Sequence, residues 1–137
     1  MGYLLTIEAP DASGKSTQSD LLCRKLKERG IPVYEHRFPN YGSNACKPAE
    51  DYLAGKLGSD PADTSAYAAS VLFAVDRYFS YRTEWKKELD RADSVVLLDR
   101  YTTSNAIHQL AKISDASERV AFLDWLYDFE FGKLALP

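Results

Sequence analysis

A turn between an apolar run and a helical pattern constrains this chain most strongly. The run Tyr3–Ile7 is short, apolar and partly β-branched, which is typical of a buried strand. From Lys15 onward the apolar residues follow a helical period that ends at Gly30. The sequence Gly14-Lys15-Ser16-Thr17 stands between the two, which is the context of a phosphate-binding P-loop. A chance match at a helix start is the alternative.

The P-loop residues have the chemistry that phosphate binding requires. Backbone N–H groups of the loop and of the helix N-terminus point at phosphate oxygens, Lys15 adds a cation, and the Ser16 hydroxyl is a magnesium ligand. The full pattern has glycine at the position of Ala9, where a methyl group would cost about 1 kcal/mol if φ were positive. The residues expected at the phosphates are Ala9, Pro10, Asp11, Ala12, Ser13, Gly14, Lys15, Ser16 and Thr17.

Strands and helices alternate along the rest of the chain. We predict strands over residues 33–38 and 95–98, and helices over residues 48–54, 60–78, 102–111 and 115–129. The long helix is expected to begin at Asp60 and to break or bend before Leu89, and Asp115 with Glu118 resembles a capping box. Strand, helix and strand over residues 3–38 form a βαβ unit, which favours a parallel pair. The alternation predicts an α/β fold with a parallel sheet, in one domain over residues 1–137.

Composition and charge limit the classes of partner. Hydrophobic residues make up 45% of the chain and charged residues 27%, which is typical of a soluble globular protein. The net charge of −3 gives no electrostatic argument for a nucleic-acid or membrane partner. No apolar stretch approaches the roughly 20 residues that span a bilayer, and no signal-peptide pattern begins the chain. Cys23 and Cys46 fit no zinc pattern or disulfide framework, so we expect a reducing, cytoplasmic location, with Cys23 in the core.

Charged side chains end two of the predicted strands. Arg37 ends the second strand, and Asp99 with Arg100 ends the third. The carboxyl ends of parallel strands meet at one edge of a sheet, so these side chains are expected to converge on the P-loop. Arginine suits phosphate there, and a carboxylate suits magnesium. The alternatives are solvated or ion-paired arginines, and Asp99 as the cap of the helix over residues 102–111.

Three more side chains have both a functional and a structural interpretation. Asp11 is unusual in a loop that binds anions, so it is expected to contact a hydroxyl group or magnesium, or else to form the turn. Phe73 and Arg77 are four residues apart and share a helix face, where Phe73 could stack on a base and Arg77 could donate to its carbonyl. The alternatives are a core position for Phe73 and a solvated Asp76-Arg77 pair.

Four motifs occur together in a fixed order. They are Glu8 to Gln18 (EAPDASGKSTQ), Arg37-Phe38-Pro39, Phe73 to Arg77 (FAVDR) and Asp99 to Asn105 (DRYTTSN). In combination they resemble the thymidylate kinases, which phosphorylate dTMP to dTDP with ATP and Mg²⁺. The resemblance runs across all 137 residues and implies a three-layer P-loop NTPase fold of the nucleoside-monophosphate kinase type.

The resemblance implies roles for individual residues. The P-loop would hold the ATP phosphates, with Ser16 and Asp99 as magnesium ligands, and Asp11 would contact the sugar hydroxyl of dTMP. The residues implied in catalysis are Lys15, Asp11, Asp99 and Arg100. The residues implied in dTMP binding are Arg37, Phe38, Phe73, Arg77, Arg100, Ser104, Asn105 and His108. His108 stands where the family often has an aromatic residue.

Three departures from the family pattern leave alternatives open. Ala9 replaces the first loop glycine, and Ala12 replaces a loop arginine that some members use in the transition state. The family continues beyond the position of Pro137 with further strands and a lid over ATP, so the chain is expected to be a truncated N-terminal portion of the fold. A non-catalytic nucleotide-binding protein and another nucleoside-monophosphate kinase are the alternative functions.

Expectations about assembly follow from the same resemblance. It implies a homodimer built on helices, with the helix around residues 67–78 as a candidate interface. Without later strands the run Tyr3–Ile7 would form an open apolar edge. We therefore expect these 137 residues to be unstable alone or to associate.

Overall fold

The protein is an α/β structure, as the alternation of its sequence predicts. The structure is a computed structural model that describes residues 1–137. The elements follow in the order β1 (Tyr3–Ile7), α1 (Lys15–Glu28), β2 (Val33–Arg37), α2 (Lys47–Leu53), the 3₁₀ turn η1 (Pro61–Asp63), α3 (Ala66–Ser80), the π-helical turn η2 (Tyr81–Trp85), α4 (Lys86–Leu89), β3 (Val95–Asp99), α5 (Thr102–Leu110), α6 (Ala116–Tyr127) and the π-helical segment η3 (Asp128–Lys133).

The three strands form one parallel sheet in the order β1-β3-β2. The predicted parallel direction is confirmed, but the direct pairing of the first two strands is wrong, because β3 lies between them. Ile7 and Arg37 both stand opposite Asp99 in the register. This register brings the carboxyl ends of all three strands level with one another, which fixes where their end residues can act.

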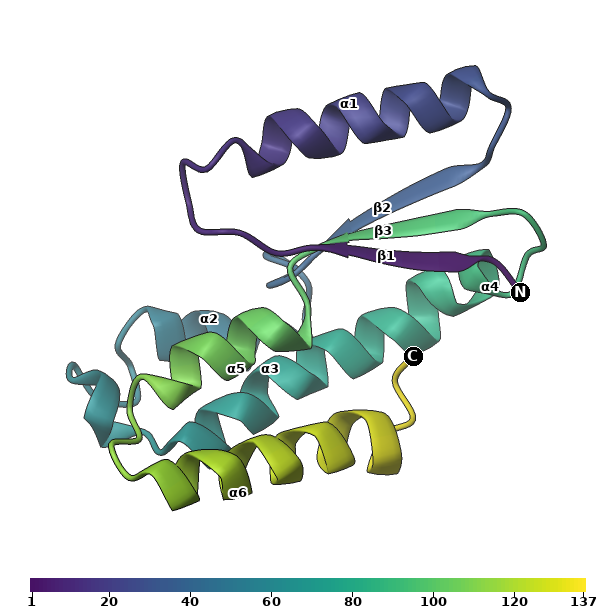
Figure 1. Ribbon diagram of the computed structural model, residues 1–137. Coiled ribbons are helices and arrows are strands. Elements are labelled where there is room, and N and C mark those ends of the chain that lie inside the picture. The colour runs from purple at the N-terminus through teal and green to yellow at the C-terminus, as the bar shows by residue number, and fades with distance from the viewer.

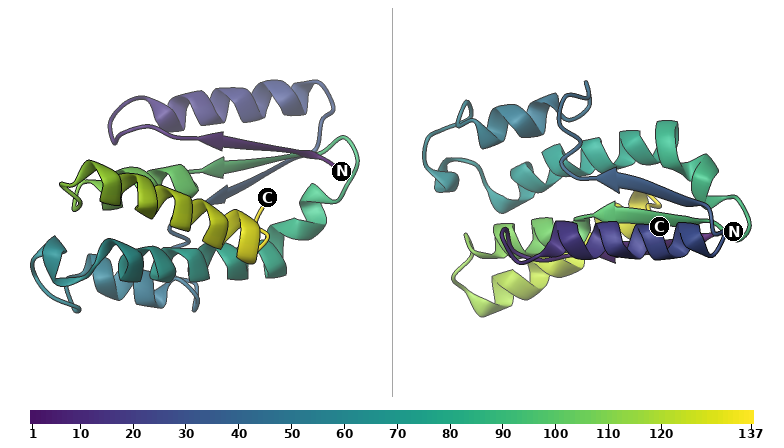
Figure 2. Two further views of the ribbon diagram at one scale, coloured as in Figure 1. Left: turned by 60° about the horizontal axis from the view of Figure 1, so that its bottom comes forward. Right: turned by 90° about the horizontal axis from the view of Figure 1, so that it is seen from above.

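The sheet is the middle of three layers (Figures 1 and 2). Helix α1 covers one face alone, and α3 to α6 cover the other. The central strand β3 is buried from Val95 to Leu98. The first strand β1 lies at the edge, where Tyr3 and Leu5 are exposed, so the expected open edge is present. None of the helices combines the length and the apolar character needed to cross a bilayer.

The hydrophobic core lies on the side of the sheet away from α1. One cluster consists of Phe38, Trp85, Leu89, Val96, Leu98 and Tyr101, and a second of Ala66, Ala106, Ile113, Phe122 and Leu126. Cys23 is the one buried residue of helix α1, which confirms the core position expected for that thiol. Each large side chain that is fully buried in these clusters stabilises the fold by about 1.5–3 kcal/mol.

The boundaries of the long helix differ from the prediction. Asp60 and Asp63 form a reciprocal capping box, but it encloses only η1. Helix α3 begins at Ala66, because the Ser65 hydroxyl accepts the N–H of Ala68 and caps the new helix. The bend expected before Leu89 is the π-helical turn η2, which joins α3 to α4. At α6 the Asp115 side chain accepts the N–H of Glu118 and so provides the N-cap, which is one half of the predicted box.

Candidate functional site

The P-loop connects the end of β1 to the start of α1, and its backbone turns sharply at two positions. Ala12 has φ of 58° and Gly14 has φ of 85°, both in the left-handed region. Ala9 has no positive φ, so the strain considered for its methyl group does not arise there and falls on Ala12 instead. A Cβ atom at Gly14 would meet no protein atom within 4 Å. The glycine is therefore required by its backbone conformation and not by crowding within the protein.

The carboxylate of Asp99 joins two cations at the end of the sheet. The Lys15 ammonium donates to Asp99 Oδ1, and Arg37 Nη2 lies 3.2 Å from Asp99 Oδ2. Lys15 comes from the first turn of α1, whereas Arg37 and Asp99 end neighbouring strands. Helix α5 is preceded by Tyr101 and has no side-chain cap, so the alternative role of Asp99 as a helix cap is wrong. The P-loop lysine, a strand-end carboxylate and a strand-end arginine thus form one cluster.

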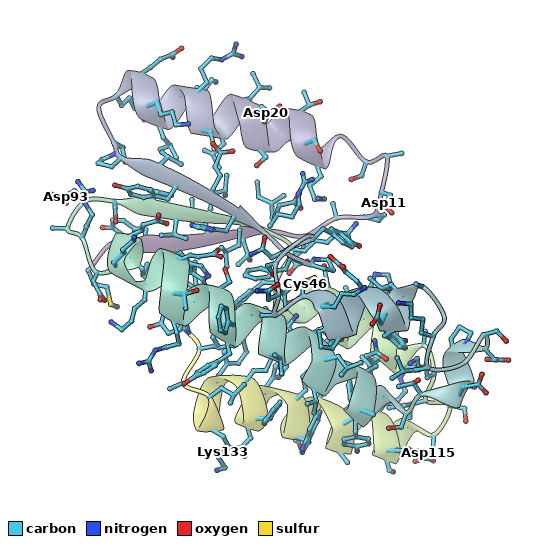
Figure 3. All side chains as sticks on the ribbon, turned by 180° about the vertical axis from the view of Figure 1, so that it is seen from behind. Asp11, Asp20, Cys46, Asp93, Asp115 and Lys133 are labelled. Atoms are coloured by element: carbon cyan, nitrogen blue, oxygen red, sulfur yellow. The ribbon has the colours of Figure 1, made fainter.

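Arg100 and Asp11 form a second charged contact beside this cluster. Arg100 Nη2 donates to Asp11 Oδ1 at 2.5 Å, and the Asp11 side chain is almost fully exposed. Figure 3 labels Asp11 on the loop that leads into α1. Arg100 has φ of 69°, which is strained for a residue with a Cβ atom. The loop carboxylate and the second arginine therefore meet across 89 residues of sequence.

Glu8 holds the turn that carries Arg100, a role that sequence reasoning missed. The N–H of Tyr101 donates to Glu8 Oε1 at 2.7 Å, and the Ser104 hydroxyl donates to Glu8 Oε2. The N–H of Arg100 also donates to the carbonyl of Ile7 at 3.0 Å. The available signal was position, because Glu8 directly follows a strand in the same way as Arg100.

The oxygen ligands expected for magnesium lie together. Ser16 and Asp99 both line a cavity of about 250 Å³ between α1 and the strands β2 and β3, together with Ser19, Asp20, Glu35, His36, Arg37 and Leu97. A hydroxyl and a carboxylate suit Mg²⁺, which takes one or two protein ligands and fills its other positions with water and phosphate oxygens. The donor set at this end of the sheet therefore fits that ion.

The side chains expected around the base come from α3 and α5. Phe73 is half-buried and packs edge-on against the ring of Tyr52, with 5.8 Å between centroids. Asn105 Nδ2 donates to the Ser70 hydroxyl at 2.8 Å, and its buried Oδ1 has no hydrogen-bond partner. His108 is exposed on α5, outside this group of contacts. Phe38 is buried against Tyr101 in the hydrophobic core, with 6.1 Å between ring centroids.

Asp76 and Arg77 are buried, so the alternative of a solvated pair is wrong. Their exposed fractions are 1% and 2%. Arg77 Nε donates to Glu130 Oε2 at 2.7 Å, in a contact that sequence reasoning missed and for which the sequence carries no periodic or motif signal. Asp76 Oδ2 accepts the N–H of Asn40 at 2.8 Å, directly after the cis peptide bond between Phe38 and Pro39. Burial raises the pKa of the Asp76 carboxyl above its usual range.

Comparisons with known proteins agree with this arrangement. The chain matches the family model described as thymidylate kinase over residues 7–121. The thymidylate kinase of Mycobacterium tuberculosis (strain ATCC 25618 / H37Rv) is 35% identical over 136 residues, covering 98% of this chain and 61% of the relative. That of Clavibacter sepedonicus is 35% identical over 118 residues, covering 85% of this chain and 53% of the relative. A solved structure of thymidylate kinase from Candida albicans superposes with a TM-score of 0.68 and 27% identity, covering 93% of this chain and 56% of that one.

The chain matches only part of each relative. The chain spans 61% or less of the length of each of these relatives. The family model nevertheless covers well over half of the chain, and it includes the P-loop and the strand-end residues from Arg37 to Arg100. The parallel sheet and the cluster around Asp99 provide the structural counterpart of that match. The chain belongs to the thymidylate kinase family.

Proposed function

We propose that this chain is a cytoplasmic thymidylate kinase unit that binds ATP with Mg²⁺ and transfers the γ-phosphoryl group to dTMP. The convergence of Lys15, Arg37, Asp99 and Arg100 at one end of the sheet carries the proposal. In parallel α/β sheets, ligands bind beyond the carboxyl ends of the strands. Family membership supports the choice of reaction.

In this proposal the chain acts by positioning and electrostatics. The loop amides and Lys15 hold the phosphates of ATP, and Lys15 moves from Asp99 to the phosphates when the nucleotide binds. Ser16 and Asp99 would hold Mg²⁺, which when bound would neutralise negative charge on the phosphates. Arg37 and Arg100 hold the phosphate of dTMP, whose oxygen attacks the γ-phosphorus in line. Fixed cations stabilise the charge that spreads over the equatorial oxygens in the transition state.

Recognition of the acceptor nucleoside uses the α3 and α5 residues. Phe73 stacks on thymine, and Arg77 donates to a thymine carbonyl oxygen. Ser104 and Asn105 line the side of the pocket formed by α5. The buried, unpartnered Oδ1 of Asn105 supports this assignment, because it offers an acceptor for a base N–H group. Asp11 contacts the sugar hydroxyl.

Association through helix α3 is a further part of the proposal. Its exposed apolar side chains include Val71, Val75, Tyr78 and Phe79, which recur at helical spacing. A stripe of this kind on one helix marks an interaction surface. We propose that two copies of the chain pack through this stripe as a homodimer.

A non-catalytic nucleotide-binding role is the second candidate. The observation in its favour is that Ala12 leaves the P-loop without the arginine implied for some members. Another nucleoside-monophosphate kinase is disfavoured by the presence of both Phe73 and Arg77 on α3, because a ring that can stack and a guanidinium that can donate to a carbonyl oxygen suit a pyrimidine base.

A coupled assay of ADP formation with dTMP, dUMP and AMP separates these candidates. The proposed function predicts turnover with dTMP above that with the other two acceptors, and loss of that turnover in Lys15→Met. Measurable dTMP binding without ADP formation from any acceptor would establish the non-catalytic role. Preference for AMP would identify a different kinase.

A further inference from the structure

We propose that Glu130 is a positioning residue that orients Arg77 and thereby sets the discrimination between 4-oxo and 4-amino pyrimidine nucleotides. This inference rests on the proposed function, because it deepens the role assigned there to Arg77. Glu130 lies in η3, 53 residues after Arg77. Neither the four motifs nor the predicted site includes it.

The contact between the two side chains is side-on and bidentate. Arg77 Nε donates to Glu130 Oε2 at 2.7 Å, and Arg77 Nη2 donates to Glu130 Oε1. The exposed fraction is 0% for Glu130 and 2% for Arg77. Two parallel hydrogen bonds in a buried pair fix the plane of the guanidinium as well as its position. The Arg77 side chain therefore has one orientation set by Glu130.

This geometry leaves part of the guanidinium available. The hydrogen bonds use Nε and Nη2, whereas Nη1 has no protein partner. Nη1 can only donate, because a guanidinium group has N–H donors and no acceptor. A carbonyl oxygen at position 4 of a pyrimidine accepts such a bond, whereas the amino group of cytosine is itself a donor and would be repelled. The pair thus presents a donor of fixed direction on the α3 residue that the proposal places at the base.

Thr102 connects this pair to the start of α5. Its hydroxyl donates to Glu130 Oε2 at 2.8 Å, so that oxygen accepts from two elements at once. Thr102 is the first residue of α5 and follows Arg100 by two positions. Glu130 therefore joins α3, α5 and η3, and fixes Arg77 relative to the start of α5. A chain of buried charged and polar contacts of this kind is sensitive to the loss of any member.

The test measures dissociation constants for dTMP, dCMP and inorganic phosphate by titration calorimetry on the 137-residue chain. Wild type is expected to prefer dTMP over dCMP. Glu130→Gln keeps the shape but removes one acceptor, so the preference should fall about tenfold, as expected when a hydrogen bond to a charged group is lost. Inorganic phosphate should bind equally in both proteins. Asp115→Asn is the matched control, because it makes the same chemical change at a helix cap where asparagine serves equally well.

Two variants at Thr102 cover the possibility that Glu130→Gln does not fold. Thr102→Val removes only the hydroxyl that donates to Glu130, so the preference for dTMP over dCMP should fall about threefold. Thr102→Ser keeps that hydroxyl and should keep the wild-type preference. In a double-mutant cycle, Glu130→Gln should have no effect on the preference once Arg77 is changed to Met. This non-additivity separates positioning from a general loss of stability.

The outcomes separate the two proposals. Wild type without a preference for dTMP would overturn the proposed base site and this inference with it. A wild-type preference that survives in Glu130→Gln, or in Thr102→Val if the former is unfolded, would overturn the role of Glu130 alone. Equal losses for dTMP and dCMP in a destabilised variant would also overturn it, since only a structural role would then remain.

Discussion

Arg100 donates to Asp11 at 2.5 Å and so links the end of the central strand to the middle of the P-loop. Both residues belong to the dTMP site in the proposed function. An incoming phosphate must therefore compete with the Asp11 carboxylate for the Arg100 guanidinium. Because the Asp11 side chain is almost fully exposed, solvent screens the ion pair and keeps that competition weak.

Two substitutions of Arg100 test the role of its charge and the role of its backbone conformation separately. Arg100→Ala and Arg100→Gly both remove the guanidinium, so both should lower dTMP affinity about tenfold or more. Glycine adopts the φ of 69° without strain, so Arg100→Gly should be more stable than Arg100→Ala by about 1 kcal/mol. Calorimetric titration and urea unfolding provide the two measurements. Unchanged dTMP affinity in both variants would remove Arg100 from the phosphate site.

The two loop alanines should respond in opposite ways to glycine. Ala12 has φ of 58°, so Ala12→Gly should raise the free energy of unfolding by about 0.5–1 kcal/mol. Ala9 has no positive φ, so Ala9→Gly should lower the free energy of unfolding by about 0.5 kcal/mol through unfolded-state entropy. Thermal unfolding of the two variants beside wild type is the measurement. The same sign for both substitutions would contradict the loop conformation described above.

Asp76 should make stability depend on pH in a defined direction. Burial raises its folded-state pKa above the ordinary value of 3.8, so its stabilising contribution is fully present below that value and is lost as pH rises through the folded pKa. Asp76→Asn has no charge to bury and keeps an acceptor for the N–H of Asn40. We expect the variant to gain stability relative to wild type between pH 4 and pH 7, by about 1 kcal/mol or more. Urea unfolding as a function of pH measures this difference.

Asp51 provides a control for that experiment, because its contribution to stability should depend on pH in the opposite direction. The ammonium groups of Lys47 and Lys56 hold the pKa of the half-buried Asp51 carboxyl below its usual range. Its contribution is therefore present above the unfolded pKa and is lost as pH falls through the folded pKa. Asp51→Asn should lose stability relative to wild type at neutral pH, and this deficit should shrink in acid. If both variants followed the same trend, the burial of Asp76 would not be the cause of its pH dependence.

Two surfaces compete to explain any self-association. If the stripe on α3 forms a dimer, Val75→Glu should shift the protein to monomer in sedimentation velocity, because a charge would be buried at the interface. If the open edge of β1 pairs instead, Leu5→Lys should have that effect, since charged residues on an edge strand oppose pairing. Val120→Glu is the control, because it adds the same charge at an exposed position on α6 that belongs to neither surface. A cooperative melt of a monomeric wild type would contradict both the dimer and the expected instability.

Local patterns predicted the elements better than their ends. The apolar runs at Tyr3–Ile7 and Val95–Asp99 are strands, because the sheet buries such runs whatever their partners. The start of the long helix was wrong, since Asp60 and Ser65 are both good caps and only packing decides which one begins the helix. The direct pairing of the first two strands was likewise wrong, because a βαβ unit leaves room for another strand between its two strands.

At the site, too, the sequence predicted some contacts and not others. The strand-end rule predicted that Arg37, Asp99 and Arg100 approach the P-loop, and the register brings them there. The rule applied equally to Glu8, whose position after β1 carried the signal. Glu130 could not be found in this way, because it lies 53 residues from Arg77 on another helical segment and belongs to none of the four motifs.

The sequence by itself determined the P-loop, the α/β class and the family, because each depends on residue types at short, fixed spacings. Only the tertiary structure decided that Asp11 pairs with Arg100, that Lys15 and Arg37 share Asp99, and that Arg77 is buried against Glu130. Those contacts join segments that are distant along the chain. They arise where packing excludes water and makes an unpaired charge costly, which a linear pattern does not encode.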